Sequence, residues 1–174
     1  SFGQSGSGKG LVSVVASQTA AKYGSMKLDY KAIMTAGWAK GEGATSEAMS
    51  VQVYKSYKQS IVDDLKKSPA DTAAARSKYD SLYTLMQDQT FPTPGTHAGY
   101  AKEAAVIGYY VLTMQAKARL DAGDAATAGD ALMKLQSLTA FLGEEKKADS
   151  AALASRTAGA LVSAGTKAMT VESN

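Results

Sequence analysis

The first residues whose types and spacing could do chemistry form GQSGSGKG, residues 3–10 of the chain. This stretch follows the phosphate-binding pattern G-x-x-x-x-G-K-[ST] until Gly10, which replaces the hydroxyl residue that holds magnesium. A phosphate-binding loop also follows a buried strand, whereas only Ser1 and Phe2 precede this one. We therefore interpret the stretch as a flexible glycine-serine lead-in. A nucleotide-binding enzyme is the alternative that a magnesium-dependent ATP titration would test.

Other catalytic candidates are few. His97 is the only histidine and cysteine is absent, which excludes multi-histidine and zinc-thiolate metal sites. The segment around His97 indicates a residue in the first turn of a helix, at the surface. Asp63-Asp64 and Glu144-Glu145 are adjacent pairs, which a helix points about 100° apart, so we interpret them as solvated charges. We expect no enzyme activity and no catalytic, cofactor-binding or metal-binding residues.

Composition limits the possible partners. The chain has 174 residues, a length that suits one domain, and its 19 basic and 16 acidic residues give a net charge of +3. This charge is too small and scattered for a nucleic-acid partner, and a weakly acidic protein surface fits better. No apolar run reaches the roughly 18 to 20 residues of a membrane span. Because the chain begins at Ser1 rather than Met, we expect a mature form that has lost a targeting segment.

Apolar spacing and helix stop signals predict an all-α fold. The expected helices span residues 46–67, 71–89, 98–122, 124–142 and 149–169, with a shorter one at 9–23. Their expected inward residues include Tyr54, Tyr57, Ile61, Leu65, Ala75, Tyr79, Leu82, Tyr83, Met86, Tyr109, Leu112, Ala128, Ala131, Leu135, Leu138, Leu153, Ala158, Leu161, Val162 and Met169. We divide the chain into a glycine-rich arm with a short helix and a docking segment, residues 1–45, and a helical bundle domain, residues 46–174.

Two short corners predict helix hairpins. Asp71 follows Ser68-Pro69, and Asp124 follows Gly123, so each corner offers an aspartate that can cap the next helix. The segments 65–73 and 120–128 match in layout, which is equally consistent with an internal duplication and with chance similarity between alanine-rich hairpins. Short corners favour antiparallel neighbours. We therefore expect an up-down antiparallel bundle of four main helices, with an additional helix at each end.

The segment 24–43 holds the only tryptophan and follows no regular apolar stripe. A large aromatic residue among glycines, with lysines nearby, has the composition of an interface anchor. The expected partner-binding residues are Trp38, Lys40, Lys27, Lys31 and Phe2. The alternative is that Trp38 folds back and covers one end of the bundle.

The segments VYKSYKQSIVDDLKKSPADTAAARSKYDSLYTL and YAKEAAVIGYYVLTMQAKARLDAGDAATAGDALMKL are tyrosine- and alanine-rich hairpins in a cysteine-free chain. They resemble the extrinsic lumenal subunits of photosystem II in algae of the red lineage, the PsbQ-like and diatom-type helical bundle proteins. The resemblance covers less than half of the chain and includes no diagnostic motif.

The resemblance implies a non-catalytic subunit in the thylakoid lumen of a plastid, peripheral to the membrane and not spanning it. There it would bind subunits of a large membrane protein complex and stabilise the oxygen-evolving region, supporting chloride and calcium retention. The glycine-rich N-terminal portion departs from a minimal bundle, which leaves open a linker between a photosystem core and its antenna proteins. A periplasmic-type helical adaptor is a further alternative.

Overall fold

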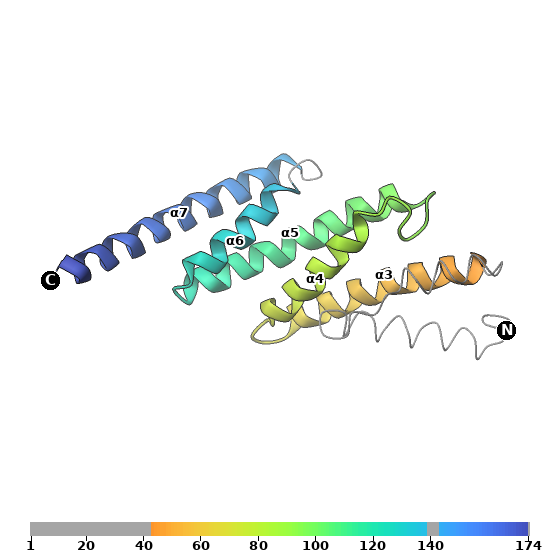
Figure 1. Ribbon diagram of the computed structural model, residues 1–174, viewed down its shortest axis with the longest axis horizontal. Coiled ribbons are helices and arrows are strands. Elements are labelled where there is room, and N and C mark those ends of the chain that lie inside the picture. Colours follow the sequence, from red (N-terminus) through yellow and green to blue (C-terminus); the bar gives the residue numbers. More distant parts are fainter. Residues whose placement is uncertain (1–42, 139–142, 174) are drawn as a thin grey trace. The chain divides into compact units, whose positions relative to one another are not determined.

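The computed structural model describes residues 43–138 and 143–173, and this part of the chain contains five α-helices and no strand (Figure 1). The all-α class is therefore confirmed for the described residues. The helices are α3 (Gly43–Lys66), α4 (Thr72–Met86), α5 (His97–Asp121), α6 (Ala125–Gln136) and α7 (Glu144–Ser173).

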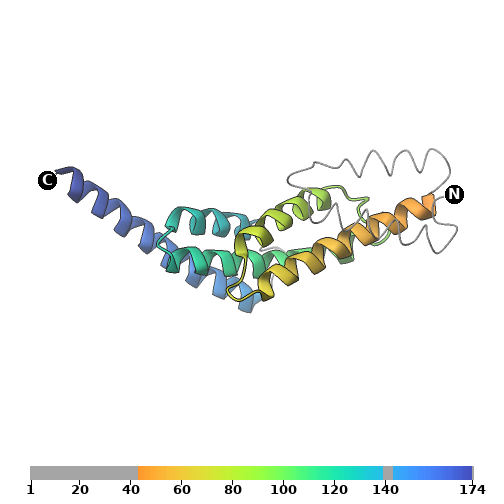
Figure 2. The same ribbon diagram turned by 90° about the horizontal axis from the view of Figure 1, so that it is seen from below.

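The chain divides into two compact units, Ser1–Ala104 and Ala105–Asn174, and the boundary falls inside α5. In the first unit α3 packs against α4. In the second unit α6 packs against α7, and α6 turns back alongside the C-terminal part of α5 (Figures 1 and 2).

In the first unit, the corner between α3 and α4 forms as the sequence predicts. Asp71 is the N-cap of α4, and its side chain accepts a hydrogen bond from the Ala74 N–H at 3.0 Å. The backbone N–H of Asp71 donates to the carbonyl of Asp64 at 2.9 Å, which closes the corner onto the end of α3. Tyr54 and Tyr57 of α3 are fully buried. The faces that pack together are thus largely the predicted ones, although Leu65 and Tyr83 are only half-buried.

In the second unit, a tight corner joins α5 to α6. Gly123 adopts φ 80°, a left-handed conformation that a side chain would strain, and its N–H donates to the carbonyl of Leu120 at 3.0 Å. Asp124 is the N-cap of α6, since its side chain accepts from the Thr127 N–H at 3.0 Å. Both predicted aspartate caps are therefore confirmed.

Several predicted helix ends are wrong. Helix α4 ends at Met86 rather than near residue 89, and α6 ends at Gln136 rather than near residue 142. After Gln136 the backbone makes turn-type bonds, and the hydroxyl of Ser137 donates to the carbonyl of Lys134 at 2.6 Å, which satisfies an end-of-helix carbonyl. Helix α7 begins at Glu144 rather than near residue 149.

The predicted buried face of α7 is also wrong between Ala158 and Val162, and the side chain of Met169 lies outside the described ones. Leu153 is buried as expected, but Ala158, Leu161 and Val162 are exposed. The reason is length, because α6 has 12 residues and α7 has 30, so α7 continues past the helix against which it packs (Figures 1 and 2). The predicted helix at 9–23 lies outside the described residues.

Candidate functional site

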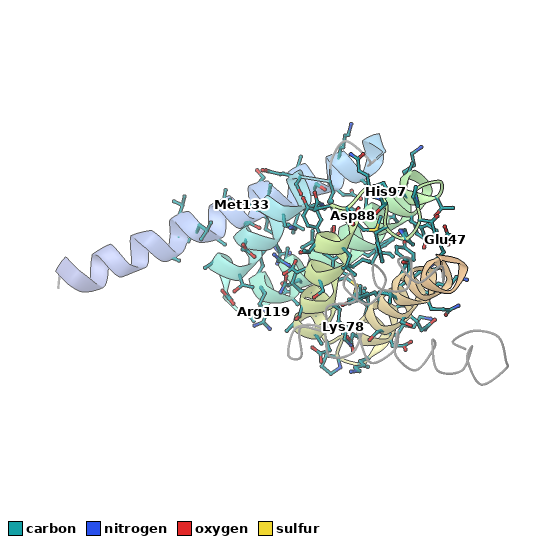
Figure 3. All side chains as sticks on the ribbon, turned by 45° about the vertical axis from the view of Figure 1, so that its right-hand side comes forward. Glu47, Lys78, Asp88, His97, Arg119 and Met133 are labelled. Atoms are coloured by element: carbon teal, nitrogen blue, oxygen red, sulfur yellow. The ribbon has the colours of Figure 1, made fainter. Side chains whose placement is uncertain are left out.

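The first polar cluster joins α3 to α4 around Asp64. Its side chain is 5% exposed and accepts from Lys78 Nζ of α4 at 2.7 Å and from Lys67 Nζ at 3.0 Å. Lys78, labelled in Figure 3, is itself 21% exposed, whereas Lys67 is 57% exposed. The prediction that Asp64 is a solvated charge is therefore wrong, while its neighbour Asp63 is exposed as expected.

The lysines decide the charge state of Asp64. Burial raises the pKa of the Asp64 carboxyl, but the hydrogen bonds from Lys78 and Lys67 outweigh burial and leave the pKa below its ordinary value. The carboxylate therefore stays ionised at neutral pH with both oxygens bonded to ammonium groups. A group held in this way is stabilised as an anion and is not poised to accept a proton.

The second polar cluster joins α3 to the start of α5. The hydroxyl of Tyr54 donates to Glu103 Oε1 at 2.9 Å, and Lys58 Nζ lies 3.0 Å from the same oxygen. The ring of Tyr100 stands edge-on to that of Tyr54, with centroids 4.5 Å apart. Burial and then the bond to Glu103 raise the pKa of Tyr54 far above its ordinary value. Tyr54 therefore acts as a hydrogen-bond donor that anchors the two helices.

A third cluster joins α5 to α7 in the second unit. Lys146 Nζ lies 5.3 Å from the ring centroid of Tyr109 and 5.4 Å from that of Tyr110. These distances suit a cation–π interaction. The hydroxyl of Tyr109 donates to Asp149 at 3.3 Å, and Tyr110 is half-exposed. The lysine, the aromatic rings and the carboxylate thus hold the start of α7 onto α5.

His97 is the first residue of α5 and is half-buried (Figure 3). Its Nδ1 lies 2.6 Å from the carbonyl oxygen of Phe91. Because a carbonyl can only accept, Nδ1 carries the proton and donates this bond. The side chain ties the beginning of α5 to the connection that precedes it. The first-turn position is as predicted, whereas the side chain is half-buried and not fully at the surface.

Exposed apolar side chains are the remaining feature. In the second unit Met133 of α6 is 73% exposed, and on α7 Leu161 is 45% and Val162 is 70% exposed. Leu161 still lies against α6 on one side, since its Cδ1 atom would be 3.7 Å from a Cβ built on Gly129. Single exposed apolar residues are ordinary, but adjacent ones on a projecting helix are a candidate contact surface.

These clusters have a common chemistry. Asp64, Glu103 and Asp149 each accept a hydrogen bond from a lysine or a tyrosine of another helix, which holds helices together. Over residues 43–138 and 143–173, no three or more histidines, cysteines or acids gather to hold a metal ion. Among the helices that the structure describes, none is long and apolar enough to cross a membrane. The arrangement supports contacts between helices and, on α7, contact with another apolar surface.

The predicted partner-binding residues Trp38, Lys40, Lys27, Lys31 and Phe2 lie outside the described residues, as does the GQSGSGKG stretch. The sequence reasoning missed two features that the structure supplies. The pairing of Asp64 with Lys78 carries no local signal. The exposure of Val162, Ser163 and Ala164 on α7 does carry one, because charged residues become rare along the helix after Arg156.

Comparisons with protein-family models, with curated proteins and with solved structures found no match to this chain.

Proposed function

We propose that this chain is a non-catalytic extrinsic subunit of a photosynthetic membrane complex on its lumenal side. In this proposal the complex is photosystem II, and the subunit stabilises the oxygen-evolving region while staying peripheral to the membrane. The observation that carries the proposal is the pair of short corners with aspartate caps at Asp71 and Asp124. They lie in the two segments on which the resemblance to the extrinsic lumenal subunits rests.

The polar contacts also support a structural subunit. Asp64, Glu103 and Asp149 accept hydrogen bonds from side chains of other helices, so their lone pairs serve the packing of this chain. An enzyme instead arranges such groups in a cleft with pKa values matched to proton transfer. The pKa values of Asp64 and Glu103 are lowered, since hydrogen bonds outweigh the burial that would raise them, which suits permanent anions.

We propose further that the helices form an antiparallel up-down bundle that makes one domain of residues 46–174. The short α3–α4 and α5–α6 corners support this arrangement, because such corners favour antiparallel neighbours. Cross-links between lysines of the two hairpins in the purified protein would test it. Cross-links confined to single hairpins would contradict a shared bundle.

Affinity purification from the native source, followed by identification of the co-purifying subunits, tests the proposed function. Photosystem II core subunits are the expected partners. Antenna proteins bridged to a photosystem core would favour the linker alternative, and partners from outside photosynthetic membranes would refute the proposal.

Reconstitution with the salt-washed complex tests the predicted anchor. Trp38→Ala should weaken association by about 2 kcal/mol or more, the range of a buried interface anchor, while thermal stability changes little. Added salt should release the wild type progressively, because Lys27, Lys31 and Lys40 would attract an acidic surface through screened charges. Normal rebinding with a much lower melting temperature would mean that Trp38 belongs to the core.

A further inference from the structure

The helix hairpins α3–α4 and α5–α6 close in the same way. In the first unit, the N–H of the cap residue Asp71 donates to the carbonyl of Asp64 at 2.9 Å. In the second unit, the N–H of the cap residue Asp124 donates to the carbonyl of Arg119 at 2.7 Å. The two acceptors are 55 positions apart in the sequence and the two caps are 53 apart, because the second corner is two residues shorter. These bonds fix which positions of one hairpin correspond to those of the other.

With the register set by the corners, the buried faces of the two hairpins coincide. Five buried positions from the start of α4 onward have buried counterparts 53 positions later, and these pairs are Thr72 and Ala125, Ala75 and Ala128, Tyr79 and Leu132, Leu82 and Leu135, and Leu85 and Leu138. Three buried positions of α3 have buried counterparts in α5, 55 positions later, and these pairs are Tyr54 and Tyr109, Tyr57 and Leu112, and Ile61 and Ala116. Any two apolar stripes can be aligned by sliding, but here the corner bonds fix the register independently.

The buried ion pair of the first unit changes at both of its positions in the second. Asp64 accepts from Lys78 at 2.7 Å, and the corresponding residues of the second unit are Arg119 and Ala131. Ala131 is fully buried and carries no charge, while Arg119 lies 4.0 Å from the carboxylate of Asp124. The second unit thus lacks the lysine where it lacks the carboxylate. This is expected if the two positions face each other in both hairpins.

A corresponding tyrosine in each unit bonds to the next long helix. The hydroxyl of Tyr54 donates to Glu103, near the start of α5, at 2.9 Å. The hydroxyl of Tyr109, 55 positions later, donates to Asp149, near the start of α7, at 3.3 Å. The partners are 49 and 40 residues apart in the sequence, so an alanine-rich composition does not produce these bonds. We call them the tyrosine latches.

We propose that α3–α4 and α5–α6 are two copies of one structural repeat, each fastened to the next long helix by a tyrosine latch at the same position. Internal duplication, rather than chance similarity, then explains why the segments 65–73 and 120–128 match. The inference goes beyond the proposed function and does not depend on it, because the free protein is sufficient for the tests.

An exchange of corners tests whether the two hairpins are equivalent. The exchange variant replaces residues 66–70 with Asp-Ala-Gly, the sequence of residues 121–123, and keeps Asp71 as the cap. A matched control carries Asp-Ala-Ala at the same place. Gly123 has φ 80°, a conformation in which a side chain lowers the folding equilibrium constant at least about fivefold. The two variants therefore differ in stability only if the transplanted corner adopts the turn of the second hairpin.

Equivalent hairpins predict wild-type helix content for the exchange variant by circular dichroism. In urea denaturation its folding equilibrium constant should be at least about fivefold higher than that of the control. Loss of helix content in the exchange variant would overturn the inference, because the second corner would then not fit between α3 and α4. Equal stability of the two variants would also overturn it, since the corner would then adopt a different turn.

Double-mutant cycles in the full chain test the latches. One cycle combines Tyr54→Phe with Glu103→Ala, and the other combines Tyr109→Phe with Asp149→Ala. Each pair should show a coupling of about two- to tenfold in the folding equilibrium constant, the size of one hydrogen bond. Tyr110→Phe is the control, because Tyr110 is half-exposed, and it should not couple to Asp149→Ala. Coupling in only one of the two cycles, or equal coupling of the control, would overturn the repeated latch.

Discussion

Replacing Asp64 with asparagine should lower the free energy of unfolding by about 3 kcal/mol. Removing one partner of a buried ion pair typically costs 3–5 kcal/mol, because the other charge is left buried without compensation. Here the other charge is Lys78, whose side chain is 21% exposed and 2.7 Å from Asp64. We expect a cost at the lower end of that range, because Lys78 stays partly hydrated and asparagine retains one acceptor oxygen.

Lys67→Met is the matched control for this prediction. Lys67 bonds to the same carboxylate at 3.0 Å, but its side chain is 57% exposed. An exposed pair contributes about 1 kcal/mol or less, so this variant should remain within that amount of the wild type. The double variant Asp64→Asn/Lys78→Met should be more stable than Asp64→Asn alone, because it removes the uncompensated ammonium.

Urea denaturation at pH 7, followed by circular dichroism, measures these differences. Because the chain divides into two compact units, the data should be fitted with one and with two transitions. The transition that shifts should be that of the first unit, which contains Asp64 and Lys78. Equal losses of unfolding free energy in Asp64→Asn and Lys67→Met would refute the ion-pair reasoning. A double variant whose loss equals the sum of the losses in Asp64→Asn and in Lys78→Met would refute it as well.

Three further predictions concern pH, glycines and caps. Because hydrogen bonds outweigh burial and lower the pKa of Asp64 from its ordinary value of 3.8, its contribution to stability is fully present above that value. That contribution is lost as the pH falls below the pKa of Asp64 in the folded protein, so the urea midpoint should decline below about pH 4. The decline should be smaller in Asp64→Asn. An equal dependence of the urea midpoint on pH in the wild type and the variant would contradict this prediction. Gly123→Ala should cost about 1 kcal/mol because φ is 80° there, whereas Gly159→Ala should raise stability by up to about 1 kcal/mol, since its Cβ would meet open space. If thermal melts show that Gly123→Ala and Gly159→Ala shift the melting temperature in the same direction, the conformational explanation is excluded. Asp71→Ala and Asp124→Ala should each cost about 1 kcal/mol in the same melts, as lost N-caps do, and a cost near zero would mean that the capping bonds do not persist in solution.

Local signals in the sequence predicted the helices and their corners. Ser68-Pro69 ends the predicted first long helix, and the described α3 ends at Lys66. Asp71 and Asp124 were predicted caps and are the caps. These features depend on residues close together in the sequence, which is why the pattern alone is sufficient.

The polar contacts between helices could not be predicted from the same signals. Asp64 and its neighbour Asp63 are alike in sequence, and only the placement of α4 buries one and exposes the other. The end of the buried face on α7 also depends on tertiary structure, because the apolar pattern continues through Leu161 and Val162 although both are exposed. Apolar periodicity indicates which face of a helix could be buried, but the length of the neighbouring helix decides where burial stops.

The contacts of α3 show why an alanine-rich helical protein keeps such polar residues inside. Asp64 of α3 is 2.7 Å from Lys78 of α4, and Tyr54 of the same helix is 2.9 Å from Glu103 of α5. Sliding α3 by one turn would displace these groups by about 5.4 Å, which neither hydrogen bond tolerates. The large buried side chains of Tyr57, Ile61 and Tyr79 oppose the same slide through packing. The two polar contacts therefore add to packing in holding the register of α3 against both neighbours, and Asp64→Asn tests their share as well as the energy of one ion pair.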